Sequence, residues 1–296
     1  MKDSFSTFHP LIICAYFAAV LFFSMFFMHP VFLAVSLLGS ALYSTLLRGG
    51  KAAGLSLLYL LPFMLFMAVI NPAFNHAGVT ILFYLKNGNP ITLESILYGL
   101  AAASMFMAVI LWFTCYNVVM TSDKFIYLFG RVIPALSLIL SMALRFVPRY
   151  REQIKVIATA QKGIGRNVTN GTIIERAKNG LQILSIMGTW ALENAIETAD
   201  SMKSRGYGLP GRTSFSIYRF DRRDQTVLGV MLLLVMVVII GAATGANRMR
   251  FFPSLKLPPL SPISLGVYFA YFILCLLPVI IDLVEALKWK YIGSAT

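Results

Sequence analysis

The sequence predicts an all-α, polytopic membrane protein with about six transmembrane helices and a cytoplasmic domain of amphipathic helices. Of its 296 residues, 58% are hydrophobic and only 12% are charged. Soluble domains contain about 45–50% apolar and about 25% charged residues, so this chain has too few charges to cover itself with a polar surface. The mean hydropathy of +0.77 agrees with this. Much of the molecule must therefore be surrounded by lipid, and we expect it in the cell membrane.

Six apolar runs approach the length of about 20 helical residues that crossing a bilayer requires. Turn or breaker residues follow the first three runs: His29-Pro30, Arg48-Gly-Gly-Lys51 and Asn71-Pro72. Between the third and fourth runs lies a mixed loop, 71–92, whose apolar stretch 79–85 is too short to span. The first run has no small-residue cleavage site, so we expect a retained helix. The expected spans are 11–28, 31–47, 52–70, 94–120, 227–241 and 265–284.

Positive charge is concentrated between the fourth and fifth spans. Residues 121–224 hold 16 Lys and Arg against 8 Asp and Glu. Cytoplasmic loops carry an excess of Lys and Arg, which explains this block more simply than nucleic-acid binding would. We therefore place the N-terminus and this block in the cytoplasm. The predicted domains are transmembrane helices 1–4 at 1–120, a cytoplasmic domain at 121–224, and transmembrane helices 5 and 6 at 225–296.

The stretch 125–146 is apolar enough to resemble a further span. It is interrupted by Arg131, Pro134 and Arg145, and a crossing would place the basic block outside. We therefore expect a long amphipathic or partly inserted helical segment on the cytoplasmic side. A hairpin that enters the bilayer and returns remains open.

The rest of the basic block has apolar residues at helical spacing and predicts three amphipathic helices. Glycines 163 and 165 end the first helix, and glycines 206 and 208 end the third. The apolar faces are Val147, Tyr150, Ile154 and Ile157; then Ile174, Ala177, Leu181 and Leu184; and finally Leu192, Ala195, Ile196, Ala199 and Met202.

The third of these helices would place one cation, Arg205, at its tip. A helix C-terminus carries a partial negative charge, so a cation there is stabilised by about 0.3–1 kcal/mol. Gly206 can end the helix because glycine adopts the left-handed conformation without strain. The local residues are compatible with an ordinary helix cap, or with an arginine that is presented to a partner protein.

Motifs for catalysis, cofactors and metals are missing from the sequence. There is no phosphate-binding G-x-x-x-x-G-K-[ST] loop and no H-E-x-x-H, and the three cysteines and three histidines are scattered. We expect no catalytic residue, no cofactor and no metal site. An intramembrane enzyme is therefore disfavoured. A stand-alone secondary carrier or channel remains the alternative, although it would need intramembrane polar sites or inverted repeats, and neither is visible.

Three segments resemble one membrane-protein family. They are the loop NPAFNHAGVTILFYL with NGNPITLE, the stretch SDKFIYLFGRVIP with SMALRFVPRY, and ALENAIETADSMKSRGYGLPGRT. They resemble the transmembrane T component (EcfT) of energy-coupling factor transporters, which are ATP-driven importers of vitamins and metal ions. The resemblance implies a non-catalytic coupling subunit. Its implied partners are two ABC-type ATPase subunits, a separate membrane-embedded substrate-binding S component, and the lipid bilayer; nucleic acid is not among them.

The resemblance also implies two ATPase-docking signatures of the type Ala-Arg-Gly. The second is matched by Ser204, Arg205 and Gly206, with serine in place of alanine. The first should lie within 160–165, where the expected arginine is missing; Lys162, followed by Gly163, is the nearest cation. Lysine lacks the bidentate fork of arginine. We take Lys162 and Gly163 as the first docking residues.

Overall fold

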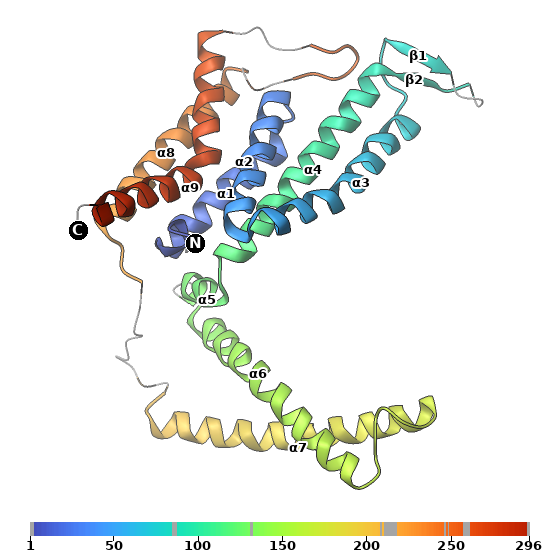
Figure 1. The fold of residues 1–296 in the computed structure, drawn as a ribbon, viewed down its shortest axis with the longest axis vertical. Helices are drawn as coiled ribbons and strands as arrows, with labels where there is room; N and C mark the ends of the chain where they lie inside the picture. Colours follow the sequence, from blue (N-terminus) through green and yellow to red (C-terminus); the bar gives the residue numbers. More distant parts are fainter. Residues whose placement is uncertain are drawn as a thin grey trace. The chain divides into compact units, whose positions relative to one another are not determined.

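The computed structural model describes residues 3–84, 88–130, 133–207, 209, 218–245, 247, 249–256 and 261–294. The regular secondary structure of this part of the chain is α-helical except for a short 3₁₀ turn, η1, and one two-stranded hairpin, which confirms the predicted all-α class (Figure 1). The elements are η1 Phe5–Thr7, α1 Pro10–Phe26, α2 Pro30–Arg48, α3 Gly50–Phe74, β1 Ile81–Tyr84, β2 Pro90–Thr92, α4 Leu93–Val119, α5 Ser122–Gly130, α6 Pro134–Gly163, α7 Ile173–Ser204, α8 Arg222–Ala243 and α9 Pro262–Ser294.

The chain forms two compact units. The first, called the membrane unit, comprises Met1–Phe125 and Tyr218–Thr296; the second, called the helical unit, is Ile126–Ile217. In the membrane unit, α2, α4, α8 and α9 are long and apolar enough to cross a bilayer, and α1 and the Leu58–Phe74 part of α3 are shorter apolar helices. Large apolar side chains such as Phe66 and Leu233 are exposed on the outer faces of α3 and α8. These observations agree with a polytopic membrane protein.

Small residues bring the helices of the membrane unit together. The helix α4 packs against α1, α2 and α3, while α9 packs against α2 and α8 (Figure 1). A Cβ atom added at Gly39 of α2 would lie 3.0 Å from the Cβ of Cys275, and one at Gly99 of α4 would lie 2.8 Å from the carbonyl oxygen of Ala68. In lipid, helices associate mainly through such close packing, because lipid tails are as apolar as the side chains.

The core of the membrane unit contains a hydrogen-bonded polar network. Trp112, which is fully buried, donates its indole N–H to Ser36 Oγ at 2.9 Å. Ser36 Oγ also lies 2.6 Å from Ser24 Oγ, which in turn lies 3.2 Å from the hydroxyl of Tyr271. The network joins α4, α2, α1 and α9, so every buried polar atom in it has a partner where no water is available.

Two boundaries differ from the sequence-based prediction. The Asn71-Pro72 pair does not end the third helix, because α3 continues through Pro62 and Pro72 to Phe74. Pro72 has no N–H for the carbonyl of Ala68, and this is the carbonyl that Gly99 approaches. Within the predicted mixed loop 71–92, the apolar stretch forms β1, which pairs antiparallel with β2 in a hairpin. Residue Lys86 lies outside the described residues.

The helical unit has fewer helix breaks than predicted. The 125–146 stretch is divided between α5 and α6, and α6 then continues without a break through Pro148 to Gly163. Proline fits the first turn of a helix, so Pro134 begins α6. The second and third predicted helices are one helix, α7, of 32 residues. Gly180 and Gly188 lie within it, and two internal glycines cost less than a second pair of helix ends would. Arg131 lies outside the described residues.

The N-terminal segment is tied to the membrane unit by charged groups. Lys124 donates hydrogen bonds from Nζ to the carbonyl oxygens of Ser6 at 2.6 Å and Val119 at 2.8 Å. Asp3 accepts a hydrogen bond from the Tyr43 hydroxyl at 3.1 Å, and the Ser4 N–H donates to Asp282 Oδ1 at 2.7 Å. Burial, and then the neighbouring Asp282 carboxylate, raise the pKa of Asp3 to about 6.

Because the pKa of Asp3 is raised, we expect the protein to be more stable at acidic pH than at neutral pH. As pH rises from about 4 to about 6, the unfolded chain releases the Asp3 proton while the folded chain retains it, so stability falls across this window and levels off above it. We expect Asp3→Asn to flatten this slope and to raise the melting temperature of the detergent-solubilised protein by a few degrees at neutral pH. Asp123→Asn, at an exposed carboxyl, is the control. An Asp3→Asn profile that still falls as steeply as the parent's would contradict the prediction.

Candidate functional site

The predicted tip residue Arg205 occupies the C-cap of α7. The N–H of Tyr207 bonds to the carbonyl of Met202 at 3.1 Å, and the N–H of Gly206 bonds to the carbonyl of Lys203 at 3.0 Å. These two bonds, with Gly206 at φ +73°, form a Schellman motif, which satisfies the last carbonyls of the helix. Arg205 is exposed at the end of the helix, next to exposed Ser204. The cap thus fixes the backbone that carries the guanidinium.

The C-terminus of α6 ends in the same motif. The N–H of Arg166 bonds to the carbonyl of Gln161 at 2.9 Å, and the N–H of Gly165 bonds to the carbonyl of Lys162 at 3.1 Å. Gly165 has φ +82°, as the left-handed position of this motif requires. The C-cap is Ile164, whose side chain is 66% exposed.

Matching the two caps position by position shows which residues of the two helix ends are equivalent. Gly165 corresponds to Gly206, Ile164 to Arg205 and Gly163 to Ser204, while Lys162 corresponds to Lys203. Both lysines lie in the last turn of their helices, where a cation is favoured by the helix dipole. Lys162 therefore lies two positions before the residue that is equivalent to Arg205. It borders a polar cavity of about 640 Å³ beside the α6–α7 connection.

The search for a cation in the sequence did not single out Ile164, which is the C-cap of α6. The signal that identifies it is the glycine register, since Ile164-Gly165 and Arg205-Gly206 are the same two cap positions. Gly208, Arg212 and Thr213, which follow the second signature, lie outside the described residues.

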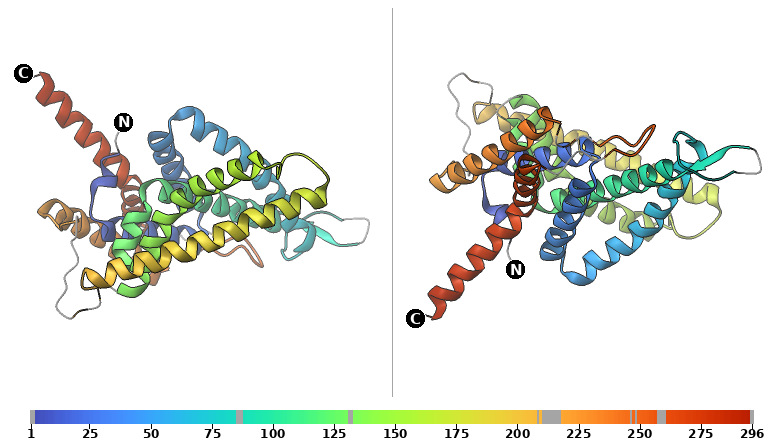
Figure 2. Two further views of the ribbon diagram at one scale, coloured as in Figure 1. Left: turned by 90° about the horizontal axis from the view of Figure 1, so that it is seen from below. Right: turned by 90° about the horizontal axis from the view of Figure 1, so that it is seen from above.

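The C-terminal half of α6 packs against the middle of α7. Ile157 of α6 is buried against Ile183 and Met187 of α7. Tyr150 meets Trp190 edge-on with ring centroids 5.6 Å apart, and the guanidinium of Arg149 lies 5.5 Å above the Trp190 ring. Figure 1 shows α7 crossing α6, and Figure 2 shows the two helices lying against each other. Each capped end therefore belongs to a long helix that is held by its contacts with the other helix.

The start of α7 is fixed as firmly as its end. Thr172 and Glu175 form a capping box, in which the Thr172 N–H donates to Glu175 Oε2 at 2.9 Å. Arg176 donates from Nε to the carbonyl oxygen of Val168 at 2.8 Å, and Asn179 donates to the carbonyl of Asn167 at 3.0 Å. These bonds attach the α6–α7 connection to the first turns of α7.

Large apolar side chains remain exposed along α6 and α7. A soluble protein rarely exposes a long apolar stripe, so these faces are expected to meet lipid or another protein. On α6 they include Leu136, Ile139, Val147 and Val156, and on α7 they include Ile174, Leu181, Leu184, Leu192 and Ile196.

The described residues contain no group of three or more His, Cys, Asp or Glu side chains that could hold a metal ion. The three cysteines are free thiols in α1, α4 and α9. The exposed, charged and apolar groups of the two helix ends are suited to protein contact.

A comparison with protein families identifies the chain's relatives. The family described as CbiQ, cobalt transport protein, matches residues 6–216. The chain belongs to the CbiQ family. This match includes all the helices from α1 to α7. The family is described as one of transport proteins, and the long apolar helices of this chain are those of a membrane protein.

Curated relatives of this CbiQ family chain include several proteins named energy-coupling factor transporter transmembrane protein EcfT. The protein from Brevibacillus brevis is 38% identical over 104 residues, which are 35% of this chain and 39% of the relative. The protein from Lactobacillus helveticus is 36% identical over 106 residues, covering 36% and 38%. The protein from Staphylococcus aureus is 31% identical over 111 residues, covering 37% and 41%. These matches span about two fifths of each relative and confirm the predicted resemblance to the T component.

Proposed function

We propose that this CbiQ family chain is the transmembrane coupling subunit of an ATP-driven importer. In this proposal the exposed C-terminal ends of α6 and α7 dock on two cytoplasmic ATPase subunits, and a separate S component binds the solute, a vitamin or a metal ion. The proposal rests on one observation, which is that the C-terminal ends of α6 and α7 have the same cap. Both long helices end in a Schellman motif with an exposed side chain at the C-cap, Ile164 in one and Arg205 in the other.

Rigid helices suit this task because coupling requires that force be transmitted without bending. The bracing at the α6–α7 crossing means that a displacement of either capped end moves both helices together. The exposed apolar faces of α6 and α7 supply a surface on which an S component can rest. ATP hydrolysis is assigned to the partner subunits.

Purification of the tagged chain in mild detergent, from cells that co-produce its partners, tests this function. We expect two subunits to co-elute that mass spectrometry identifies as ABC-type ATPases, and solute uptake by the reconstituted complex to require ATP. Uptake by this chain alone in proteoliposomes would instead support a stand-alone carrier or channel. Elution without ATPases, under conditions that keep the chain folded, would also count against the coupling role.

The Ile164 cap predicts that the two ATPase contacts differ in chemistry. An exposed isoleucine gains about 1.5–3 kcal/mol on burial, so we expect an apolar groove for α6 and an anionic one for α7. Ile164→Asp should then weaken ATPase binding by roughly tenfold to a hundredfold in a pull-down titration. Ile196→Asp, at a side chain of similar exposure on α7, is the matched control. Equal binding by the parent and Ile164→Asp would exclude Ile164 from the contact.

A further inference from the structure

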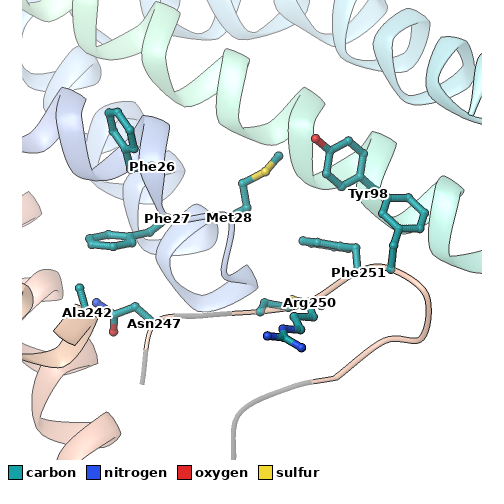
Figure 3. A pocket seen from close by; sticks show the side chains of 10 residues that line it. Phe26, Phe27, Met28, Tyr98, Ala242, Asn247, Arg250 and Phe251 are labelled. Atoms are coloured by element: carbon teal, nitrogen blue, oxygen red, sulfur yellow. The ribbon is translucent and has the colours of Figure 1, made fainter. Parts of the chain in front are cut away.

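A second candidate site lies in the membrane unit, at the end of the helices where α1 and α8 finish and α4 begins. It is a cavity of about 640 Å³, a volume within the range of pockets that hold small molecules. Figure 3 shows its wall, which includes Phe27, Met28, Tyr98, Asn247, Arg250 and Phe251. Tyr98 meets Phe251 edge-on, with ring centroids 5.3 Å apart.

Asn247 supplies a buried acceptor to this wall. Its side chain is only 3% exposed, and its Nδ2 donates to the carbonyl oxygen of Val238 at 3.3 Å. Its Oδ1 is buried and accepts no hydrogen bond from any residue that the structure describes. A buried carbonyl oxygen without a donor is unfavourable, so the cavity suits a ligand that brings an N–H or O–H group to this atom.

Arg250 supplies a cation three residues further along. Its backbone is fixed by two hydrogen bonds with Lys256, at 3.2 Å and 2.9 Å, while its side chain is exposed. Within the described part of the chain no carboxylate forms a salt bridge with Arg250. A guanidinium matches the geometry of phosphate oxygens, so this position favours an anionic phosphate group.

The apolar wall continues onto the outside of α1. Phe26 also lines the cavity, is 66% exposed, and stacks on Phe22 with centroids 4.3 Å apart. The cavity lies at the ends of apolar helices, where a bilayer places its headgroups and where aromatic residues gather. The ligand must therefore combine an anion, a hydrogen-bond donor and an apolar body.

We propose that this cavity binds a membrane phospholipid whose headgroup donates a hydrogen bond, such as an ethanolamine or glycerol headgroup. Its phosphate pairs with Arg250, its N–H or O–H group bonds to Asn247 Oδ1, and an acyl chain lies on Phe26 and Phe22. Inorganic phosphate would satisfy Arg250 but leave the aromatic wall uncovered. A choline headgroup carries the phosphate and the chains but has no donor for Asn247.

Lipid competition tests the proposal on the full chain. The purified protein is equilibrated in detergent with equal amounts of phosphatidylethanolamine and phosphatidylcholine of the same acyl chains, and bound lipid is counted by native mass spectrometry. We expect about fivefold preference for the ethanolamine lipid, which corresponds to one hydrogen bond. Asn247→Leu should reduce the ratio to about one. Equal retention of the two lipids by the parent, or a preference that survives Asn247→Leu, would overturn the proposal.

Arg250→Gln provides a second test that does not threaten the fold, because the side chain is exposed. It should lower retention of both lipids by about tenfold or more without changing their ratio. Lys256→Gln, in the same segment, is the matched control and should change neither. Inorganic phosphate and soluble phosphoethanolamine are added as competitors. If either displaces the lipid at equal concentration, the acyl chains contribute nothing and the site is one for a free phosphate compound, which contradicts the proposal.

Discussion

Arg205→Glu should abolish stable association with one ATPase subunit and stop ATP-driven uptake while leaving membrane insertion intact. In the proposed docking, Arg205 pairs with carboxylates in a groove that excludes water. Breaking such a charge-assisted contact costs about 2–5 kcal/mol, so we expect the affinity to fall at least about thirtyfold. The substitution also places an anion at the negative end of α7, at a cost of about 0.3–1 kcal/mol. This local cost is too small to unfold a helix braced at the α6 crossing.

Two control variants isolate the role of the guanidinium. Arg205→Lys keeps the charge but loses the bidentate fork, so it should retain partial binding. Lys178→Glu makes the same charge reversal at an exposed position near the other end of α7 and should bind normally. Co-elution and uptake are measured for each variant. Normal uptake by Arg205→Glu would remove Arg205 from the docking contact.

The same prediction depends on which side of the membrane holds α7. A cysteine at position 205 can be labelled with a membrane-impermeant maleimide, because Cys115 and Cys275 are buried and Cys14 lies within α1. Arg205→Cys should react only in inverted vesicles or after permeabilisation. Labelling in intact cells would place this helix end where no cytoplasmic ATPase can reach it.

Much of the fold was predictable because lipid selects long apolar helices, and prolines mark the starts of several of them, although Pro72 and Pro148 lie inside helices. His29-Pro30 begins α2, and Thr92 and Glu94 begin α4, as their types suggest. The β1–β2 hairpin was not predictable because the run 81–84 is apolar at every position and lacks a period of two. Long-range hydrogen bonds support the hairpin: Thr80 Oγ1 donates to Glu94 Oε1 at 2.9 Å, and Thr92 Oγ1 donates to the Ala77 carbonyl at 2.8 Å.

The second docking signature could be located from sequence, whereas the position equivalent to Arg205 in the first could not. Gly206 predicted a helix end, and the backbone there has the expected left-handed glycine. In α6 two glycines, 163 and 165, flank Ile164, so sequence alone left open which of them took the left-handed position. The φ of +82° belongs to Gly165, and this fixes Ile164 as the cap. The roles of both caps, and of Lys162 and Gly163, remain predictions.

Trp112→Ala should be the most destabilising single substitution in the membrane unit among those considered. Trp112 is fully buried, and its ring contacts Tyr16 and Phe17 with centroids 6.1 Å and 6.3 Å away. Lipid tails provide little hydrophobic drive between helices, so the loss is mainly the packing of these rings around a new cavity. Removing a large buried aromatic side chain costs about 3–5 kcal/mol. We expect a fall of many degrees in the melting temperature measured in detergent.

Two further substitutions separate packing from hydrogen bonding at this position. Trp112→Phe keeps an aromatic ring but removes the donor to Ser36. It should destabilise the protein less than Trp112→Ala, because the remaining ring keeps much of the packing. Ser36 still has Ser24 as a partner at 2.6 Å, so the hydroxyl is not left unpaired. Trp289→Ala deletes the same side chain at a position that is 72% exposed and should leave the melting temperature nearly unchanged. If the Trp112→Ala and Trp289→Ala variants had the same melting temperature, the packing of α4 against α1 and α2 would depend on contacts other than those of Trp112.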